Sequence, residues 1–274
     1  MIVDVNVNLS RWPFRRLPFD KTPELVRKLR QNGVTQAWAG SFDAVLHNDM
    51  AAVNARLVAE CRRHDSKLLL PVGSINPTLP DWREDLRRCH QVHGMHAIRL
   101  HPNYHGYTLG SDACHELCAL ASKQRLIVQL VLRIEDERSH HPLLQVPTVD
   151  TAPLEELVVK HKDLRLIVMN NYGTVRGAAL GKLVKSGHVF FEISHSEQVG
   201  ALEKFVKQVP YERVLWGSHF PFFNLEATTL KFRESRLGDF ITKAIQHTNA
   251  QQLWDDTQAP RTGHRPRPSD SYPV

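Results

Sequence analysis

Short apolar runs alternate along the chain with longer amphipathic stretches. In the first run, residues 2–9, valines alternate with Asp4, Asn6 and Asn8. This pattern predicts a strand with the valines on one face and the polar residues on the other. Pro23 then opens an amphipathic stretch that ends at Gly33, as is typical of a helix. The chain therefore begins with a strand followed by a helix.

The same order of strand and helix repeats to the end of the pattern. We predict further strands at residues 34–41, 67–75, 95–101, 126–133, 164–170, 189–194 and 213–217. Helices are predicted after them at 48–64, 79–93, 112–123, 152–161, from 174 onward, 197–209 and 225–254. No hairpin signal interrupts this order, so the sheet should be parallel. Eight such units predict an α/β protein with a (β/α)8 TIM barrel.

A chain of 274 residues suits one such barrel, which we place at residues 1–254 as a single domain. The remaining residues, 255–274, are rich in proline and arginine, and we expect a disordered or loosely packed tail.

The net charge of +6 comes largely from helix faces and the tail, and no basic stripe alternates with aromatic residues. This argues against a nucleic-acid partner. No apolar run is long enough to span a bilayer, so we expect no membrane association. The four cysteines show no Cys-x-x-Cys spacing, which is typical of reduced thiols in a cytoplasmic protein. The sequence leaves open whether the protein forms a homo-oligomer.

Candidate chemistry is densest in residues 95–107, where an apolar run passes into polar residues. Ala97, Arg99 and His101 should share one face of a strand. An arginine and a histidine that face inward are costly unless they bind something.

Other predicted strands also carry polar residues near their carboxyl ends, where the active site of such a barrel lies. These residues are Asn6, Asn8, Ser41, Arg99, His101, Arg133, Asn171, Glu192, Ser194 and His219. We expect them to converge at one mouth of the barrel.

Structural interpretations of these residues stand beside the functional ones. Asn6 or Asn8 could be a hydrogen-bonded core amide, and His101 and His105 could brace a loop. Glu192 lies between apolar residues and would need a partner in a barrel wall, which favours a role in the site. The long polar loop at 134–151 could be a solvated loop or a lid.

Five segments resemble the amidohydrolase superfamily, in the branch called amidohydrolase-related or amidohydrolase 2. Residues 4–8 resemble its first-strand motif Asp-x-His-x-His, and residues 94–102 resemble its fourth-strand segment. Residues 167–173 resemble its sixth-strand segment, residues 214–221 its eighth-strand Gly-Ser-Asp-x-Pro, and residues 248–253 its closing Asn-Ala-x-x-Leu. The resemblance spans nearly the whole chain and implies the same barrel.

The departures from this family fall on its metal ligands. The resemblance implies one or two divalent metals held by histidines and by an aspartate that is also the general acid/base. The corresponding positions here are Asn6, Asn8, Asn171 and His219. Because a carboxamide oxygen is a poor ligand for zinc, the usual metal site cannot form as such.

Three interpretations follow. The favoured one is a hydrolase that needs no metal, as the resemblance implies for relatives such as 2-pyrone-4,6-dicarboxylate lactonase, acting on a C–O or C–N bond of a small anionic lactone, amide or ester. The second is one relocated divalent metal such as zinc, on His101, Glu192 and His219. The third is a binding protein that has lost its chemistry.

The favoured interpretation assigns a role to each candidate. The catalytic candidates are His219, His101 and Glu192, with either histidine as the general base. Candidates for substrate binding or for stabilising a developing oxyanion are Asn6, Asn8, Arg99, Arg133, Arg138, Asn171, Tyr104 and His105. No cofactor is favoured.

Overall fold

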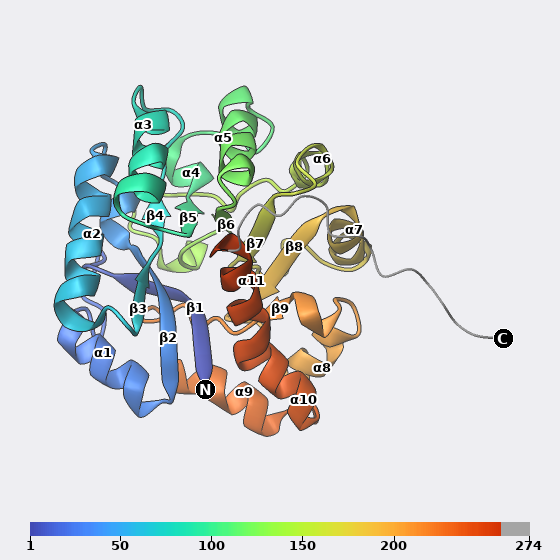
Figure 1. Ribbon diagram of the computed structural model, residues 1–274. Coiled ribbons are helices and arrows are strands. Elements are labelled where there is room, and N and C mark those ends of the chain that lie inside the picture. The colour runs from blue at the N-terminus through green and yellow to red at the C-terminus, as the bar shows by residue number, and fades with distance from the viewer. Residues whose placement is uncertain (259–274) are drawn as a thin grey trace.

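Parallel strands surround a central interior, and helices pack around them, in a computed structural model that describes residues 1–258 (Figure 1). The strands are β1 (Ile2–Leu9), β2 (Val34–Ser41), β3 (Leu69–Pro71), β4 (Gly73–Ser74), β5 (Ala97–Leu100), β6 (Ile127–Val131), β7 (Arg165–Met169), β8 (His188–Glu192) and β9 (Val214–Leu215). The helices are α1 (Thr22–Gln31), α2 (Met50–Asp65), α3 (Trp82–Arg87), α4 (Pro102–His105), α5 (Asp112–Lys123), α6 (Leu154–Lys160), α7 (Ala178–Ser186), α8 (Ala201–Val206), α9 (Leu225–Glu234), α10 (Asp239–Lys243) and α11 (Asn249–Gln258). Short 3₁₀ turns lie at Phe42–Val45, Glu137–Ser139 and Tyr211–Arg213, and π turns at Arg88–Val92 and Ala244–Thr248.

Strand order follows chain order. β1, β2 and β3 pair in parallel, and so do β4 through β9. Only Val72 separates β3 from β4, and its amide donates to the carbonyl of Ala39 at 2.8 Å. The amide of Val5 donates to the carbonyl of Trp216 at 3.0 Å, so β1 also lies beside the segment after β9. The predicted (β/α)8 TIM barrel is confirmed.

Most predicted elements lie within a few residues of their expected bounds. The third strand, predicted at 67–75, is divided into β3 and β4 because each half pairs with a different neighbour. The helix expected from Thr174 begins only at Ala178. Residues 255–258, assigned to the tail, belong to α11. The rest of the predicted tail, 259–274, lies outside the described residues.

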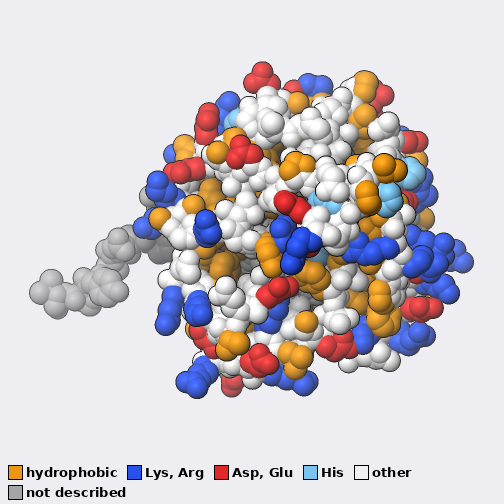
Figure 2. All heavy atoms as spheres, turned by 180° about the vertical axis from the view of Figure 1, so that it is seen from behind, with side chains coloured by type: hydrophobic (Ala, Val, Ile, Leu, Met, Phe, Trp, Pro, Cys, Tyr) orange, Lys and Arg blue, Asp and Glu red, His pale blue; other side chains and the backbone are white. Residues whose placement is uncertain are grey.

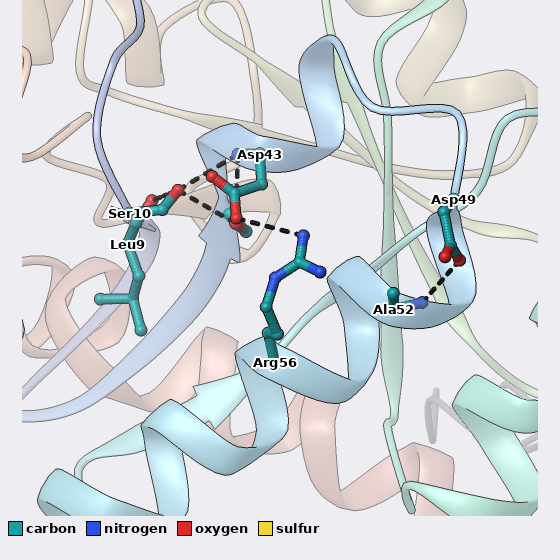
Figure 3. Close-up of polar contacts among 7 residues, drawn as sticks. Leu9, Ser10, Asp43, Asp49, Ala52 and Arg56 are labelled. Carbon is teal, nitrogen blue, oxygen red and sulfur yellow. Dashed lines mark hydrogen bonds and ion pairs between the residues drawn. The ribbon is translucent and has the colours of Figure 1, made fainter.

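Helix starts follow the expected capping chemistry. The Asp49 carboxylate accepts a hydrogen bond from the amide of Ala52 at 2.9 Å and caps α2 (Figure 3). Ser111 caps α5 in the same way, because its hydroxyl accepts from the amide of Cys114. One turn further along α2, Arg56 reaches back to Asp43 after β2 (Figure 3).

The interior of the barrel is apolar at its amino-terminal end. Val3, Ala97, Ile127 and Ile167 belong to one buried cluster that also contains Ala250, Leu253 and Trp254 of α11. Figure 1 shows α11 crossing the middle of this end. The helix therefore covers the mouth opposite the carboxyl ends of the strands.

The predicted faces of β1 were wrong. Val3 and Val5 pack in the interior cluster, whereas Val7 and Leu9 pack outside it with Leu25 of α1. The pairing of β1 with β2 shifts register between Asp4 and Val7. A shift of one residue exchanges the two faces of a strand. The strand is thus apolar inside at its start and places Asn6 and Asn8 in the interior hydrogen-bond network at its end.

The four cysteines are buried free thiols, consistent with a packing role. Within residues 1–258, no helix combines the length and the apolar character needed to cross a membrane.

Candidate functional site

The face opposite α11 carries the carboxyl ends of the strands, and basic side chains gather near its middle (Figure 2). Beneath this face lie a hydrogen-bond network of buried amides, carboxylates and one arginine, and beside it a group of histidines. Both come from the ends of strands, as the sequence predicted.

Arg99 on β5 is the centre of the network. It is 1 % exposed, and its guanidinium donates to five oxygens. The acceptors are Asn8 Oδ1 at 2.6 Å, Gln129 Oε1 at 2.7 Å and the carbonyls of Val7, Trp38 and Val5 at 3.1, 3.3 and 3.5 Å. A guanidinium has five N–H donors. No N–H group of Arg99 is left for a substrate carboxylate. The predicted substrate-binding role of Arg99 is therefore corrected to that of a hydrogen-bond donor inside the barrel.

The charge of Arg99 is balanced by two carboxylates that are not among its hydrogen-bond acceptors. Burial lowers the pKa of Arg99 to about 10, so it stays protonated at neutral pH, and the nearby carboxylates of Asp4 and Glu192 favour its charged form. Asp4 is itself buried, which raises its pKa to about 6. It accepts from the amides of Asn6 and Ser218, both at 3.0 Å, and so holds β1 against the last strand segment.

A second part of the network runs from β1 to β8. Asn6 Nδ2 donates to Asn170 Oδ1 at 2.7 Å, and the amide of Asn170 donates to Glu192 Oε1 at 2.6 Å. Ser194 adds its amide and its hydroxyl to the same carboxylate, at 2.7 and 2.8 Å. Burial raises the pKa of Glu192. Glu192 thus accepts two hydrogen bonds from Ser194 after its own strand and one from Asn170 after β7, so the structure gives it a bracing position rather than the predicted catalytic one.

Asn170, and not the predicted Asn171, faces this network. Asn171 turns away and exchanges hydrogen bonds with the backbone of Val175, at 2.8 and 2.9 Å. Asn170 takes a left-handed backbone conformation with φ +55°, which asparagine tolerates better than most residues and which redirects the chain at the end of β7. In the sequence, the neighbouring pair Asn170-Asn171 at the end of this strand was the signal that could have indicated Asn170.

His219 follows β9 and is 1 % exposed. Its Nε2 lies 2.6 Å from the carbonyl of Ile134, so Nε2 carries the proton and donates it. Its Nδ1 is buried and finds no hydrogen-bond partner among the described residues. Burial is the main cause that lowers the pKa of His219 to about 4. The ring is therefore neutral at pH 7, with a free lone pair on Nδ1.

His195, directly after the predicted seventh strand, was missed. Its ring centroid lies 5.7 Å from that of His219, and neither of its nitrogens has a partner in the described part of the chain. Burial, then the charges near it, lower its pKa to about 2. The Ser194-His195-Ser196 sequence at a strand end was the signal that could have found it.

Arg133 and Tyr172 lie beside the pair of His195 and His219. The Arg133 guanidinium stacks on the Tyr172 ring at 4.0 Å, and Tyr172 contacts His195 at 5.3 Å. Arg133 Nε is buried without a partner in residues 1–258. A cavity of about 500 Å³ is lined by His195 and Tyr172. His219, His195, Arg133 and Tyr172 form what we call the histidine–arginine group.

Of the remaining predicted site residues, His101 and Tyr104 line a small cavity together with Arg133. His105 Nε2 lies 2.9 Å from the carbonyl of Ala44, and Tyr104 packs edge-on against Trp12, so both brace loops. His101 is buried beside His105, and its pKa is well below the usual value. Arg138 is exposed and paired with Asp136 at 2.8 Å.

The residues present do not fit a metal ion. In the described chain no three His, Cys, Asp or Glu side chains come close enough to hold one. The relocated set of His101, Glu192 and His219 does not form such a group, and the carboxylate of Glu192 already accepts three hydrogen bonds. We therefore derive no chemical step through a metal.

Comparison with known proteins gives one family and several solved structures. Comparison with the curated proteins gives no match. An uncharacterised TIM-barrel protein from Bordetella bronchiseptica is similar at 12 % identity and TM-score 0.70, covering 94 % of this chain and 99 % of that one. A 5-carboxyvanillate decarboxylase from Sphingomonas paucimobilis is similar at 10 % identity and TM-score 0.74, covering 93 % and 98 %. A dihydroxybenzoic acid decarboxylase from a Polaromonas species, solved with bound manganese and 2-nitroresorcinol, is similar at 12 % identity and TM-score 0.70, covering 94 % and 98 %.

At these identities the solved structures establish the fold alone. The family comes from a sequence model described as Amidohydrolase, which matches residues 11–255 and so covers most of the chain. The matched residues include four of the five segments that carried the resemblance, and residues 4–8 precede them. The chain belongs to the amidohydrolase family.

Proposed function

We propose that the protein hydrolyses a C–O or C–N bond of a small carboxylated molecule such as a lactone, amide or ester, with His219 as the general base. The observation that carries this proposal is the state of His219: a neutral ring held through Nε2 by the Ile134 carbonyl, with Nδ1 free of protein partners among the described residues. A general base must be unprotonated at the working pH and within hydrogen-bond reach of the proton that it takes.

The proposed reaction uses three residues of the histidine–arginine group. Water loses a proton to His219 Nδ1 while its oxygen attacks the substrate carbonyl carbon. Arg133 offers its unpaired Nε–H to a substrate carboxylate or to the oxygen on which charge develops. The protonated His219 then returns the proton to the leaving oxygen or nitrogen. His195 lines the cavity, and its ring centroid lies 5.7 Å from that of His219.

The amides assigned to the oxyanion in the sequence have other partners. Asn6 Nδ2 donates to Asn170 and Asn171 Nδ2 donates to the carbonyl of Val175, while Asn8 is held through Oδ1 by Arg99. The proposal therefore transfers this role to Arg133.

Substrate reaches His219 only after a local movement, because the side chain is 1 % exposed. The segment 134–151 begins at the residue that anchors His219 and is held by Asn103, which donates to the carbonyl of Pro147 at 2.5 Å. Arg15 pairs with Glu135 in the same segment. We propose that this segment opens for substrate entry, so opening and the orientation of the base are coupled.

The test is turnover of a panel of lactones, esters and carboxylated amides, with carboxylated phenols added to detect decarboxylation. We expect hydrolysis by the wild type and a loss of about 10²–10⁴-fold in kcat for His219→Ala, the usual contribution of a general base. Arg133→Met should raise KM for carboxylated substrates more than for uncharged ones. His47→Ala, an exposed histidine after β2, is the matched control.

Three results would overturn the proposal. Unchanged kcat in His219→Ala would remove His219 from the reaction. Tight binding of carboxylates without turnover would favour a non-catalytic binding protein, and release of CO₂ from the phenols would favour a decarboxylase.

A further inference from the structure

We propose that the guanidinium of Arg99 is the resident cation of the barrel interior, built into the chain where the family resemblance would place a metal ion. The proposal concerns which cation holds the strand ends together, and it does not depend on the reaction proposed above.

The contacts of Arg99 form a cage of oxygens from three strands. β1 supplies Asn8 Oδ1 and two carbonyls, β2 supplies the carbonyl of Trp38, and β6 supplies Gln129 Oε1. Gln129 also donates to the carbonyl of Val5 at 2.8 Å, which fixes the orientation of its amide. All five acceptors are neutral, so the cage suits a cation that brings its own directed donors.

The barrel wall leaves room for this side chain. A Cβ on Gly40 would lie 2.6 Å from Arg99 Nη1 and 2.9 Å from Cζ. The backbone of Gly40 lies outside the left-handed region, so its lack of a side chain is explained by this close approach and not by backbone conformation. The position beside Asn8 is therefore shaped around a guanidinium.

The charge of Arg99 disfavours a second cation beside Asn8. The carboxylates of Asp4 and Glu192 favour the charged form of Arg99, so the guanidinium remains a cation in the interior. A divalent ion beside Asn8 would meet the charge of Arg99 in a medium that screens charges poorly. It would also find Asn8 Oδ1 already occupied.

The first arm of the test uses the wild type. Protein purified without chelator and without a metal-affinity tag should contain less than about one tenth of an equivalent of divalent metal by elemental analysis. Incubation with EDTA should leave its melting temperature unchanged, because metals that bind the folded state raise it. Stoichiometric metal together with a fall in melting temperature on chelation would overturn the proposal, whether or not the protein is an enzyme.

The second arm removes the cation and supplies it again. Arg99→Ala should melt about 10 °C or more below the wild type, because five buried acceptors lose their donors. Guanidinium chloride at low millimolar concentration should raise the melting temperature of Arg99→Ala relative to the same concentration of NaCl. A ligand that binds only the folded state has this effect.

Matched variants separate this effect from general changes in stability. Arg99→Met fills the space with apolar atoms and should not respond to guanidinium. Arg83→Ala removes an exposed arginine and should melt close to the wild type. An Arg99→Ala variant that melts like the wild type, or that does not respond to guanidinium, would contradict the proposal. If Arg99→Ala does not fold, the wild-type arm decides.

Discussion

Arg99 Nη1 lies 2.6 Å from Asn8 Oδ1, so an arginine on β5 holds the amide that stands at a family metal-ligand position on β1. The family resemblance aligns Asn8 with a metal-binding histidine, and here the same position binds a cation that belongs to the chain. The hydrogen bond links the first strand of one sheet with a strand of the other. This hydrogen bond therefore stabilises the barrel, and the guanidinium of Arg99 fills the interior beside Asn8.

Replacement of Asn8 should show the strength of this link. Asn8→Leu leaves one N–H of a buried guanidinium without an acceptor and should lower the free energy of unfolding by about 2–4 kcal/mol. Asn8→Asp keeps the acceptor and adds a counter-charge, so it should be less damaging. Urea unfolding at pH 7 measures both. Equal losses in the two variants would show that the bond to Arg99 does not matter.

Gly40 should not tolerate a side chain. Gly40→Ala would force its Cβ against Arg99 Nη1 and should cost about 1–3 kcal/mol, the range for overpacking in a core. Gly181 in α7 is the matched control, because a Cβ there meets nothing within 4 Å. Gly181→Ala should leave stability unchanged or raise it by about 0.5–1 kcal/mol through helix propensity. Thermal unfolding of the two variants checks this contrast.

Acid should destabilise the protein through His219. Its pKa is about 4 in the folded state and 6.5 as an unperturbed group. Below pH 6.5 the unfolded chain gains a proton that the folded protein does not, so stability falls as the pH drops from about 6.5 towards 4. Asp4 acts oppositely over the range from 3.8 to about 6, because its folded pKa is raised.

The His219→Gln variant isolates this contribution. The introduced glutamine would keep a donor for the Ile134 carbonyl but cannot titrate. The loss of unfolding free energy between pH 7 and pH 5 should be smaller in the variant by about 2 kcal/mol, from 1.36 kcal/mol per pH unit. Urea titrations of both proteins at the two pH values give the difference directly. Identical pH slopes would show that His219 is not neutral and buried.

The segment 134–151 should open more readily without its ion pair. Arg15 is 41 % exposed on its side chain and pairs with Glu135, whose side chain is buried. Arg15→Ala should speed limited proteolysis within 134–151 several-fold and change global stability by less than about 1–2 kcal/mol. Arg16→Ala is the control, because Arg16 pairs with Asp20 away from this segment. Cleavage at the same rate in all three proteins would argue against a latch at Arg15.

Local patterns in the sequence predicted most of the fold. The apolar runs mark the strands, and Pro23 and Gly33 lie at the two ends of α1, because both signals depend on neighbours within a few residues. The sequence also predicted that Arg99 faces inward and that His219 ends the last strand unit.

Tertiary structure alone decided the partners of these residues. The register shift in β1 changed which faces point inward, and a left-handed residue at the end of β7 brought in Asn170 in place of Asn171. Alternation predicts faces only while the register is regular. The sequence predicted that Arg99 binds a substrate carboxylate. Its actual acceptors lie up to 94 residues away in the chain, and only the structure shows them. A hydrogen bond between two strands forms only where the complete fold places the two strands side by side. The local pattern of either strand does not contain that information.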